Sequence, residues 1–350
     1  MHECKEFGEF SQESRNFMII SSSPLRFSLN GGGSDLPSFL EVAEGLTVSM
    51  PLNKYVYVTL HESFSENYRI AYSQIEDPKT IQEIRHPIVR ACLELLEWEG
   101  PALEITSVAD VPSNGTGLGS SSAFTVALIA GILHLQGRKL NYFDIAKLAC
   151  DVEIEILKSP IGYQDQYSTA MGEINVLRFY KGGKVEIEPV FGNQKEKNIF
   201  VSKLNESLLF FHIDQPRSAN EILNKQQFNI RNGSAATLTT KKMVQLAGET
   251  VSCMKIMNIP QLGKLLTDGW ALKTSINGDD SDANLTRLIE WCSTAPIYGA
   301  KLLGAGGGGF LAVLAEKSKH GSIINSLDKK YRHYDAKVEI LGPRVQRFGG

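Results

Sequence analysis

The sequence is poor in cysteine and histidine, and neither residue type occurs at the spacing of a metal site or a disulfide framework. Its five cysteines are widely separated and include no CxxC pair, and its seven histidines form no HExxH motif. An odd number of distant cysteines argues against a disulfide-stabilised secreted domain and favours a reducing cytoplasmic compartment.

Long apolar runs and a strong excess of one charge are also missing. No stretch of about 18 apolar residues is present, so no transmembrane helix is expected. Residues 1–17 are polar and lack the apolar core of a signal peptide, which favours a flexible tail. A net charge of −3 argues against a surface dominated by nucleic-acid or anionic-membrane binding. The 350 residues suffice for about two ordinary globular domains.

Glycine, in contrast, is concentrated in three short segments. They are residues 30–35 (NGGGSD), 114–122 (NGTGLGSSS) and 304–309 (GAGGGG). Glycine allows a backbone to approach a ligand closely or to adopt positive φ. Three such segments predict one binding site assembled from three distant parts of the chain.

Hydrophobic patterning predicts a mixture of strands and helices, and a polar stretch predicts a domain boundary near residue 195. Two glycines, Gly182 and Gly183, predict the turn of a hairpin within residues 174–190. The predicted strands cover residues 18–30, 46–61, 103–109, 208–214, 309–315 and 336–341. The predicted helices cover residues 121–136, 142–158, most of 217–294 and about 319–331.

The middle glycine segment has the features of a phosphate-binding turn. A predicted strand leads into the glycines, then into Ser120, Ser121 and Ser122, and then into an apolar helix. A helix N-terminus has unpaired N–H groups and a partial positive charge, which favour an anion. The segment lacks the GK[ST] of a P-loop and the GxGxxG of a dinucleotide fold. By itself it predicts either a phosphate and Mg²⁺ site or a glycine turn capped by serines.

One acidic residue of the helix predicted at 142–158 lies on its apolar side. At about 100° per residue, Lys147, Asp151 and Glu155 share one face, whereas Glu153 falls among apolar residues on the opposite face. A carboxylate in that position is costly unless a cation accompanies it. Two interpretations remain open here, a buried ion pair with an arginine or a ligand of Mg²⁺.

All three glycine segments resemble motifs of the GHMP kinases, named for galacto-, homoserine, mevalonate and phosphomevalonate kinases. SPLRFSLNGGGSDLP is similar to their first motif, PSNGTGLGSSSA to their nucleotide motif and KLLGAGGGGF to their third. The motifs occur in the family's order. The resemblance implies the two-domain α+β fold of these kinases, with a ribosomal-protein-S5-like domain at 18–195 and a ferredoxin-like domain at 196–350. It also implies that Mg·ATP and a sugar bind between the two domains.

The resemblance implies roles for individual residues. Asp165, expected in a loop, would orient or deprotonate the acceptor hydroxyl, and Arg26 would lie beside it and the γ-phosphate. By itself a loop aspartate is as readily a turn residue or a helix cap. Mg²⁺ would be held by Ser121 and by Glu153, which stands 12 residues before Asp165. ATP would be bound by Pro112, Gly115, Gly117, Leu118, Gly119, Ser120, Ser121 and Ser122. The acceptor would be bound by Asp35, Gly32, Gly33, Gln164, Gly306 and Gly307.

Two local features reduce the range of sugars that the resemblance implies as substrates. The GYQDQY segment around Asp165 resembles the sugar-1-kinase branch that includes D-glycero-D-manno-heptose 7-phosphate kinase, and Gly32-Gly33 replaces the Glu-His pair of galactokinases. Arg217 and Ser218, at a predicted helix start, resemble a stretch of those heptose kinases and suit a substrate phosphate. Asp-Gln-Pro precedes Arg217 where the family often has Gly-x-x, and a surface ion pair is the other interpretation of this arginine.

The sequence thus predicts a sugar-phosphate 1-kinase that supplies activated heptose for lipopolysaccharide or capsule synthesis. The alternatives are a 1-kinase for a fucose- or galactose-like sugar and a non-catalytic sugar sensor on the same fold. No nucleic-acid or membrane partner is expected.

Overall fold

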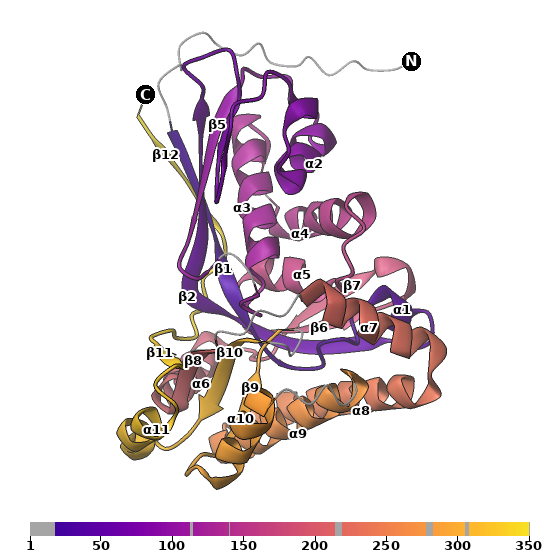
Figure 1. The fold of residues 1–350 in the computed structure, drawn as a ribbon, viewed down its shortest axis with the longest axis vertical. Helices are drawn as coiled ribbons and strands as arrows, with labels where there is room; N and C mark the ends of the chain where they lie inside the picture. Colours follow the sequence, from indigo (N-terminus) through magenta and orange to yellow (C-terminus); the bar gives the residue numbers. More distant parts are fainter. Residues whose placement is uncertain are drawn as a thin grey trace.

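The computed structural model describes residues 18–112, 115–139, 141–213, 219–277, 283–304 and 308–349. Figure 1 shows an upper part, in which strands stand beside stacked helices, and a lower part dominated by long helices. The described residues form an eight-stranded and a four-stranded sheet with helices packed on both, so the predicted α+β class is confirmed.

The first sheet is organised around two long antiparallel strands, β1 (Met18–Asn30) and β2 (Gly45–Glu62). Their register shifts between Pro24 and Arg26 and again between Ser28 and Asn30. Such irregularities bend a strand, and they let the two ends of β2 pair with different neighbours. The other strands are β3 (Arg69–Ala71), β4 (Ile75–Glu76), β5 (Leu103–Ala109), β6 (Asn175–Phe179), β7 (Val185–Pro189) and β12 (Arg344–Phe348). Their order is β12-β1-β2-β5-β3-β4, with β6 on β2 and β7 on β6.

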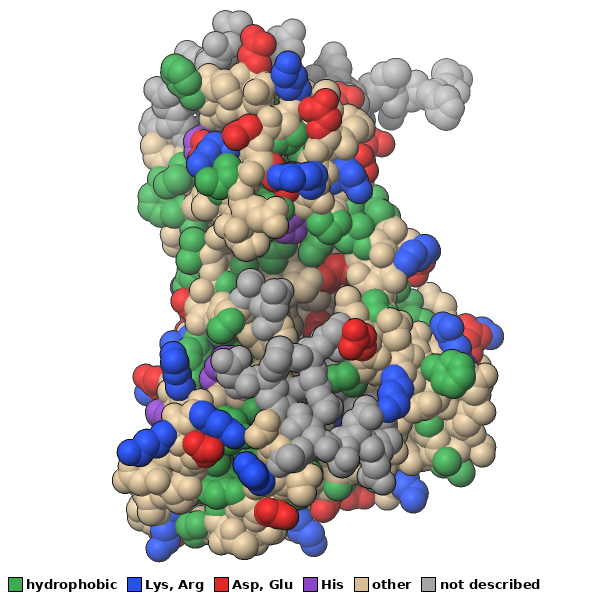
Figure 2. Space-filling view, viewed as in Figure 1, with side chains coloured by type: hydrophobic (Ala, Val, Ile, Leu, Met, Phe, Trp, Pro, Cys, Tyr) green, Lys and Arg blue, Asp and Glu red, His purple; other side chains and the backbone are tan. Residues whose placement is uncertain are grey.

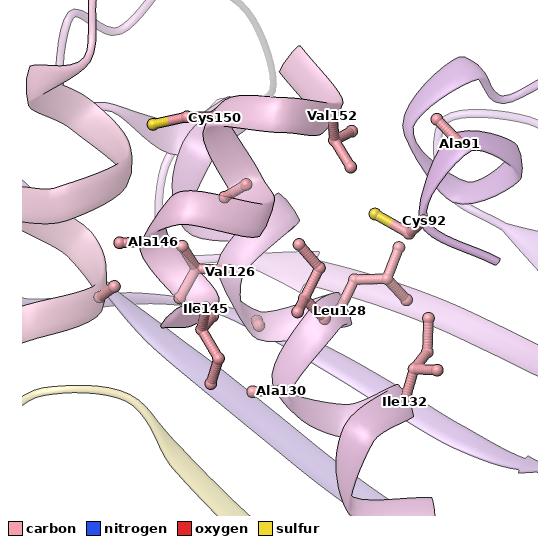
Figure 3. Close-up of a cluster of buried hydrophobic side chains, with 14 of the residues drawn as sticks. Ala91, Cys92, Val126, Leu128, Ala130, Ile132, Ile145, Ala146, Cys150 and Val152 are labelled. Carbon is pink, nitrogen blue, oxygen red and sulfur yellow. The ribbon is translucent and has the colours of Figure 1, made fainter. Parts of the chain in front are cut away.

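Helix α3 (Ser120–Leu135) is the central helix of the upper part. It packs against β1 and β2 on one side and against α2 (Pro87–Leu95), α4 (Tyr142–Cys150) and α5 (Gln164–Met171) on the others. A helix that is covered on all sides needs apolar residues around its whole circumference, as this sequence has. Figure 3 shows part of this packing, in which Cys92 of α2 points toward the aliphatic side chains of the cluster and Cys150 of α4 lies at its edge.

The second sheet has the order β11-β8-β10-β9 and is antiparallel throughout. One of its faces shares a core with the lower half of β1, where the rings of Phe27 and Phe210 meet edge to face with centroids 5.5 Å apart. The shared core fixes the two parts of the molecule against each other. The strands are β8 (Leu208–Ile213), β9 (Gly299–Leu302), β10 (Gly309–Leu314) and β11 (Arg332–Tyr334).

The remaining helices belong mostly to the lower part of the chain (Figure 1). Helices α8 and α9 form a long antiparallel pair, and α9 also packs against β9. None of the helices in the described part combines the length and apolar character needed to cross a membrane. The bounds are α1 (Pro37–Leu40), α6 (Gln194–Ser207), α7 (Ala219–Asn232), α8 (Ser234–Lys255), α9 (Ile259–Asn277), α10 (Ala283–Thr294) and α11 (His320–Ser326), with 3₁₀ turns at Ile81–Glu83, Lys181–Gly183 and Lys317–Lys319.

Most predicted elements are confirmed, including the hairpin β6–β7, in which Gly182 and Gly183 have φ of 77° and 76°. The end of the chain differs from the prediction. The predicted helix at 319–331 is only α11, and the predicted strand at 336–341 is a single bridge between Val338 and Leu52. The pairing strand is instead β12, which returns to β1 in the first sheet. The division into domains at residue 195 stays a prediction.

Candidate active site

The three glycine segments meet in one cavity of about 510 Å³, as the sequence predicts. Its wall includes Gly32, Gly117 and Gly304, one from each segment. The second and third segments touch so closely that a Cβ at Gly304 would lie 2.3 Å from the Cα atom of Gly117. Only glycine permits that approach, which explains why the segments need this residue. Figure 2 shows a hollow at mid-height on this face, with acidic side chains visible inside it.

The middle segment forms a turn that ends at the N-terminus of α3. Gly115, Gly117 and Gly119 have φ of 68°, 70° and 73°, and Gly119 is the N-cap of the helix. Ser120 and the two serines after it form the first helical turn and line the cavity. The unpaired N–H groups of this turn therefore face a space that an anion can enter.

Two residues predicted for this turn do not line the cavity. Pro112 is exposed, and Leu118 is buried in the core shared by the two parts of the molecule. The carbonyl oxygen of Leu118 accepts a hydrogen bond of 2.9 Å from the backbone N–H of Arg26, which ties the turn to β1.

Glu153 is buried at the side of this turn, with only 2% of its surface exposed. Its Oε1 accepts a hydrogen bond from Ser121 Oγ at 2.7 Å, and its Oε2 accepts from Ser122 Oγ at 2.7 Å and from Gln166 Nε2 at 2.8 Å. No described lysine or arginine forms an ion pair with it, so the arginine pairing is not found. Burial raises the pKa of the Glu153 carboxyl, although its three hydrogen bonds oppose the rise.

The backbone around Glu153 is not an ordinary α-helix. Residues Asp151–Ile156 form a π-helical turn that continues α4. This wider turn changes the helical period, and the aliphatic Ile156 at its end is 47% exposed. Glu153 itself faces inward, as predicted.

These groups suit Mg²⁺, which proteins usually hold through one or two carboxylates together with substrate phosphates and water. The described residues contain no cluster of three or more His, Cys, Asp or Glu side chains that could enclose a metal ion alone. A single buried carboxylate beside the Ser121 hydroxyl and a turn with unpaired N–H groups therefore fits Mg²⁺ that arrives with a nucleotide.

Arg26 and Asp165 form the centre of the cavity wall. Asp165 lies in the first turn of α5, not in a loop as predicted, because the chain becomes helical directly after Tyr163. Arg26 Nε donates to Asp165 Oδ1 and Arg26 Nη2 donates to Asp165 Oδ2, both at 2.8 Å. The Asp165 side chain keeps 30% of its surface exposed, so its oxygens can reach a ligand in the cavity.

The first glycine segment presents a second carboxylate, Asp35. Its Oδ1 accepts from the backbone N–H of Gly33 at 2.8 Å and its Oδ2 from that of Gln164 at 3.1 Å. Burial raises the pKa of the Asp35 carboxyl. Gln164 lines the cavity next to Asp35, and its Nε2 donates a hydrogen bond of 2.7 Å to Ser28 Oγ. Gly32, Asp35 and Gln164, all predicted to bind the acceptor, thus lie together.

Two lysines of the lower part line the same cavity and were missed at the sequence level. Lys273, on α9, donates from Nζ to the carbonyl oxygen of Gly304 at 2.7 Å. Lys301, on β9, donates to the carbonyl oxygens of Ser28 and Leu29 at 3.0 and 2.6 Å. Lys273 follows the buried Trp270 by three residues, so the helical periodicity that identified Glu153 could have found it.

The other predicted acceptor residues, Arg217, Ser218, Gly306 and Gly307, lie outside the described residues.

Comparison with known families agrees with this arrangement. Residues 86–173, from α2 to the end of α5, match the family model of the GHMP kinases N terminal domain. Residues 251–333, from the end of α8 to β11, match that of the GHMP kinases C terminal domain. The chain carries both GHMP kinase domains. The first of them contains the glycine-serine turn, Glu153 and Asp165.

Several proteins resemble this GHMP kinase chain along most of its length. It is 25% identical over 324 residues to a D-glycero-alpha-D-manno-heptose 7-phosphate kinase of Campylobacter jejuni, a match that covers 89% of this chain and 94% of the relative. It is 24% identical to a bifunctional fucokinase/GDP-fucose pyrophosphorylase of Arabidopsis thaliana, covering 90% of this chain but 31% of that protein. The crystal structure of a D-glycero-D-manno-heptose 1-phosphate kinase from Bacteroides thetaiotaomicron has the same fold, with a TM-score of 0.76, 21% identity and coverage of 95% of this chain and 100% of that one.

Proposed function

We propose that this GHMP kinase transfers the γ-phosphoryl group of ATP to carbon 1 of D-glycero-D-manno-heptose 7-phosphate. The observation that carries the proposal is the Arg26–Asp165 pair, which stands between the phosphate-binding turn and the Asp35 subsite. A phosphoryl donor on one side and a hydroxyl acceptor on the other would meet at this pair.

The chain's own residues would act mainly by positioning, because phosphoryl transfer requires little covalent chemistry from the protein. The N–H groups of the glycine-serine turn would hold the phosphates, and Arg26 would stabilise charge on the transferring group. Asp165 would accept a hydrogen bond from the acceptor hydroxyl and orient it, or take its proton. Its carboxylate oxygens can accept further hydrogen bonds beyond those from Arg26.

Ser121 and Glu153 would hold Mg²⁺ beside the same phosphates. When bound, the ion neutralises negative charge on the β- and γ-phosphoryl oxygens. Glu153 supplies an ionisable carboxylate that no described cation neutralises, which supports this assignment.

The choice of heptose 7-phosphate rests on the similarity to the Campylobacter kinase and on two features of this sequence. Gly32 and Gly33 stand where galactokinases carry a Glu-His pair, so this chain has fewer side chains to hold an unphosphorylated hexose. Arg217 and Ser218 would bind the terminal phosphate, with the guanidinium gripping two of its oxygens. A fucose 1-kinase is the second candidate, favoured by the similarity to the fucokinase of Arabidopsis. The Arg26, Asp165 and Glu153 set argues against a non-catalytic sensor.

A sugar panel tests the proposal. ADP release would be followed with heptose 7-phosphate, unphosphorylated heptose, fucose and galactose, and phosphorus NMR would identify the phosphorylated carbon. We expect heptose 7-phosphate to have the highest kcat/KM and the product to be the 1,7-bisphosphate. Equal use of both heptoses, or faster use of fucose, would contradict the heptose-phosphate assignment.

A further inference from the structure

Lys273 is a buried cation at the acceptor end of the cavity, and the transfer chemistry above does not use it. Only 8% of its surface is exposed, and it reaches the cavity from α9, in the lower part of the molecule. Its Nζ would lie 4.0 Å from a Cβ at Gly32, and the side-chain oxygen of Gln164 would lie 3.3 Å from the same point. The ammonium and this amide therefore flank Gly32 together.

The described residues use only part of the hydrogen-bonding capacity of this ammonium. A lysine ammonium has three N–H donors, and among the described residues the hydrogen bond it makes is to the carbonyl oxygen of Gly304. Unmet donors on a buried charge are costly. A ligand with oxygen atoms would satisfy them.

The charged groups that act on Lys273 are those of the Asp35 side of the cavity and of the Arg26–Asp165 pair. Asp35 and Asp165 attract the ammonium, while Arg26 repels it. Lys273 forms no direct ion pair with either of these two carboxylates. Both oxygens of the Asp165 carboxylate already accept hydrogen bonds from Arg26. Asp35 and Lys273 thus line one cavity without an ion pair between them, a carboxylate that accepts hydrogen bonds and an ammonium that donates them.

We propose that Lys273 determines acceptor specificity, by binding one hydroxyl oxygen of a polyol while Asp35 accepts a hydrogen bond from a neighbouring hydroxyl. Adjacent hydroxyls of a sugar ring match this pairing of a donor with an acceptor. The inference rests on the proposed transfer to a sugar. It adds a residue of the lower part of the molecule to an acceptor subsite otherwise made by the first glycine segment and α5.

The first experiment replaces Lys273 with methionine, which keeps the length of the side chain and removes the ammonium. Lys264→Met is the matched control, because Lys264 is exposed on the same helix. With the sugar that the unmodified protein phosphorylates fastest, we expect Lys273→Met to raise the acceptor KM by roughly 10- to 100-fold, as for a lost hydrogen bond to a charged group. The KM for ATP should change by less than about threefold, since uniform binding of the acceptor alone is lost. An unchanged acceptor KM, or a change confined to ATP or kcat, would overturn the inference.

A second measurement uses equilibrium binding by calorimetry, so that it does not depend on turnover. The sugar and its monodeoxy analogues would be titrated into unmodified protein and Lys273→Met. One analogue should bind the unmodified protein more weakly than the parent sugar but bind the variant as well as the parent does. Losses that simply add for every analogue would overturn the inference, as would the absence of sugar binding to unmodified protein.

Gly32→Ala provides an independent variant if Lys273→Met is unstable. Its methyl group would stand between Lys273 and Gln164 and should weaken sugar binding while ATP binding is kept. Full sugar affinity in this variant would overturn the inference. The results distinguish the failure of one proposal from that of the other. If the protein binds sugar through Lys273 but does not phosphorylate it, only the kinase function is contradicted. If Lys273→Met phosphorylates the sugar as well as the unmodified protein does, only the role of Lys273 is contradicted.

Discussion

Arg26 and Asp165, which are 139 residues apart in the sequence, form a bidentate ion pair in which both N–O distances are 2.8 Å. Arg26 also donates from Nη1 to the carbonyl oxygen of Gly117 in the glycine-serine turn. One guanidinium therefore fixes β1, α5 and the turn at the place where the two substrates would meet. Lysine cannot make this set of contacts, because its single ammonium lacks the planar fork.

Arg26→Lys should consequently reduce kcat by roughly 10- to 100-fold, the cost of a lost hydrogen bond between charged groups. Steady-state kinetics with saturating ATP and sugar would measure it. Arg69→Lys is the control, since Arg69 pairs with Glu104 at a partly exposed position on the first sheet. Near-normal turnover by Arg26→Lys would show that only the charge at this position matters.

Glu153→Gln should raise the Mg²⁺ concentration needed for half-maximal activity without lowering the melting temperature at pH 8. The folded-state pKa of Glu153 is raised, so the ionised carboxylate opposes folding at pH values above that pKa, and a neutral amide removes the cost. Gln166 Oε1 is buried without a partner, so rotation of the Gln166 amide can offer an acceptor to the new amide. Glu155→Gln, on the same turn but exposed, should change neither property. A large loss of stability with an unaltered Mg²⁺ requirement would give Glu153 a structural role.

Gly119→Ala should weaken ATP binding and reduce turnover. A Cβ at Gly119 would lie 3.1 Å from Arg26 Cγ and 3.5 Å from Asp165 Oδ2, so it would crowd the ion pair as well as the phosphate space. Gly137→Ala controls for backbone strain, because Gly137 has φ of 66° and open space around it. Both variants should lose about 1 kcal/mol of stability, but only Gly119→Ala should lose ATP affinity by calorimetry. Equal ATP affinity in the two variants would remove Gly119 from the nucleotide site.

The stability of the protein should depend on the ionisation of Lys273. Burial lowers its pKa to about 8, although Asp35 and Asp165 oppose the shift. Between about pH 8 and the ordinary pKa of lysine, about 10.4, the unfolded state therefore binds more protons than the folded state. The free energy of unfolding rises with pH across this range. Lys273→Met should be more stable than unmodified protein at pH 7, with the difference in melting temperature shrinking toward pH 10. A difference that does not vary with pH would mean that Lys273 is solvated.

The sequence predicted those parts of the site whose signal is local. Three glycine segments, each readable within about ten residues, converge as expected, and the helical period alone placed Glu153 on the buried face. Lys301 carried no such signal, because its partners are the carbonyl oxygens of Ser28 and Leu29, more than 270 residues away.

Two wrong predictions of secondary structure, for β12 and for the segment around Asp165, also arise from contacts between distant parts of the chain. Strand β12 is short and mostly exposed, and only its pairing with β1 makes it a strand, so its own residues gave no pattern to detect. Asp165 lies beside glycine and polar residues that favour a loop, yet α5 forms because Gln166 and Tyr167 are buried against the upper core. In each case contacts between distant segments outweighed local preference.

The most direct test of the central claim is transfer of label from γ-labelled ATP to heptose 7-phosphate by unmodified protein and by Asp165→Asn. The substitution is nearly isosteric but replaces one acceptor of the Arg26 hydrogen bonds by an amide N–H, so calorimetry of ATP and sugar binding is needed to separate a loss of binding from a loss of turnover. We predict sugar-dependent transfer by the unmodified protein and a rate lower by roughly 10²–10⁴ in the variant, the usual contribution of a catalytic acid–base group. Failure of the unmodified protein to label any sugar while it binds ATP, or transfer at the same rate by Asp165→Asn, would contradict the account.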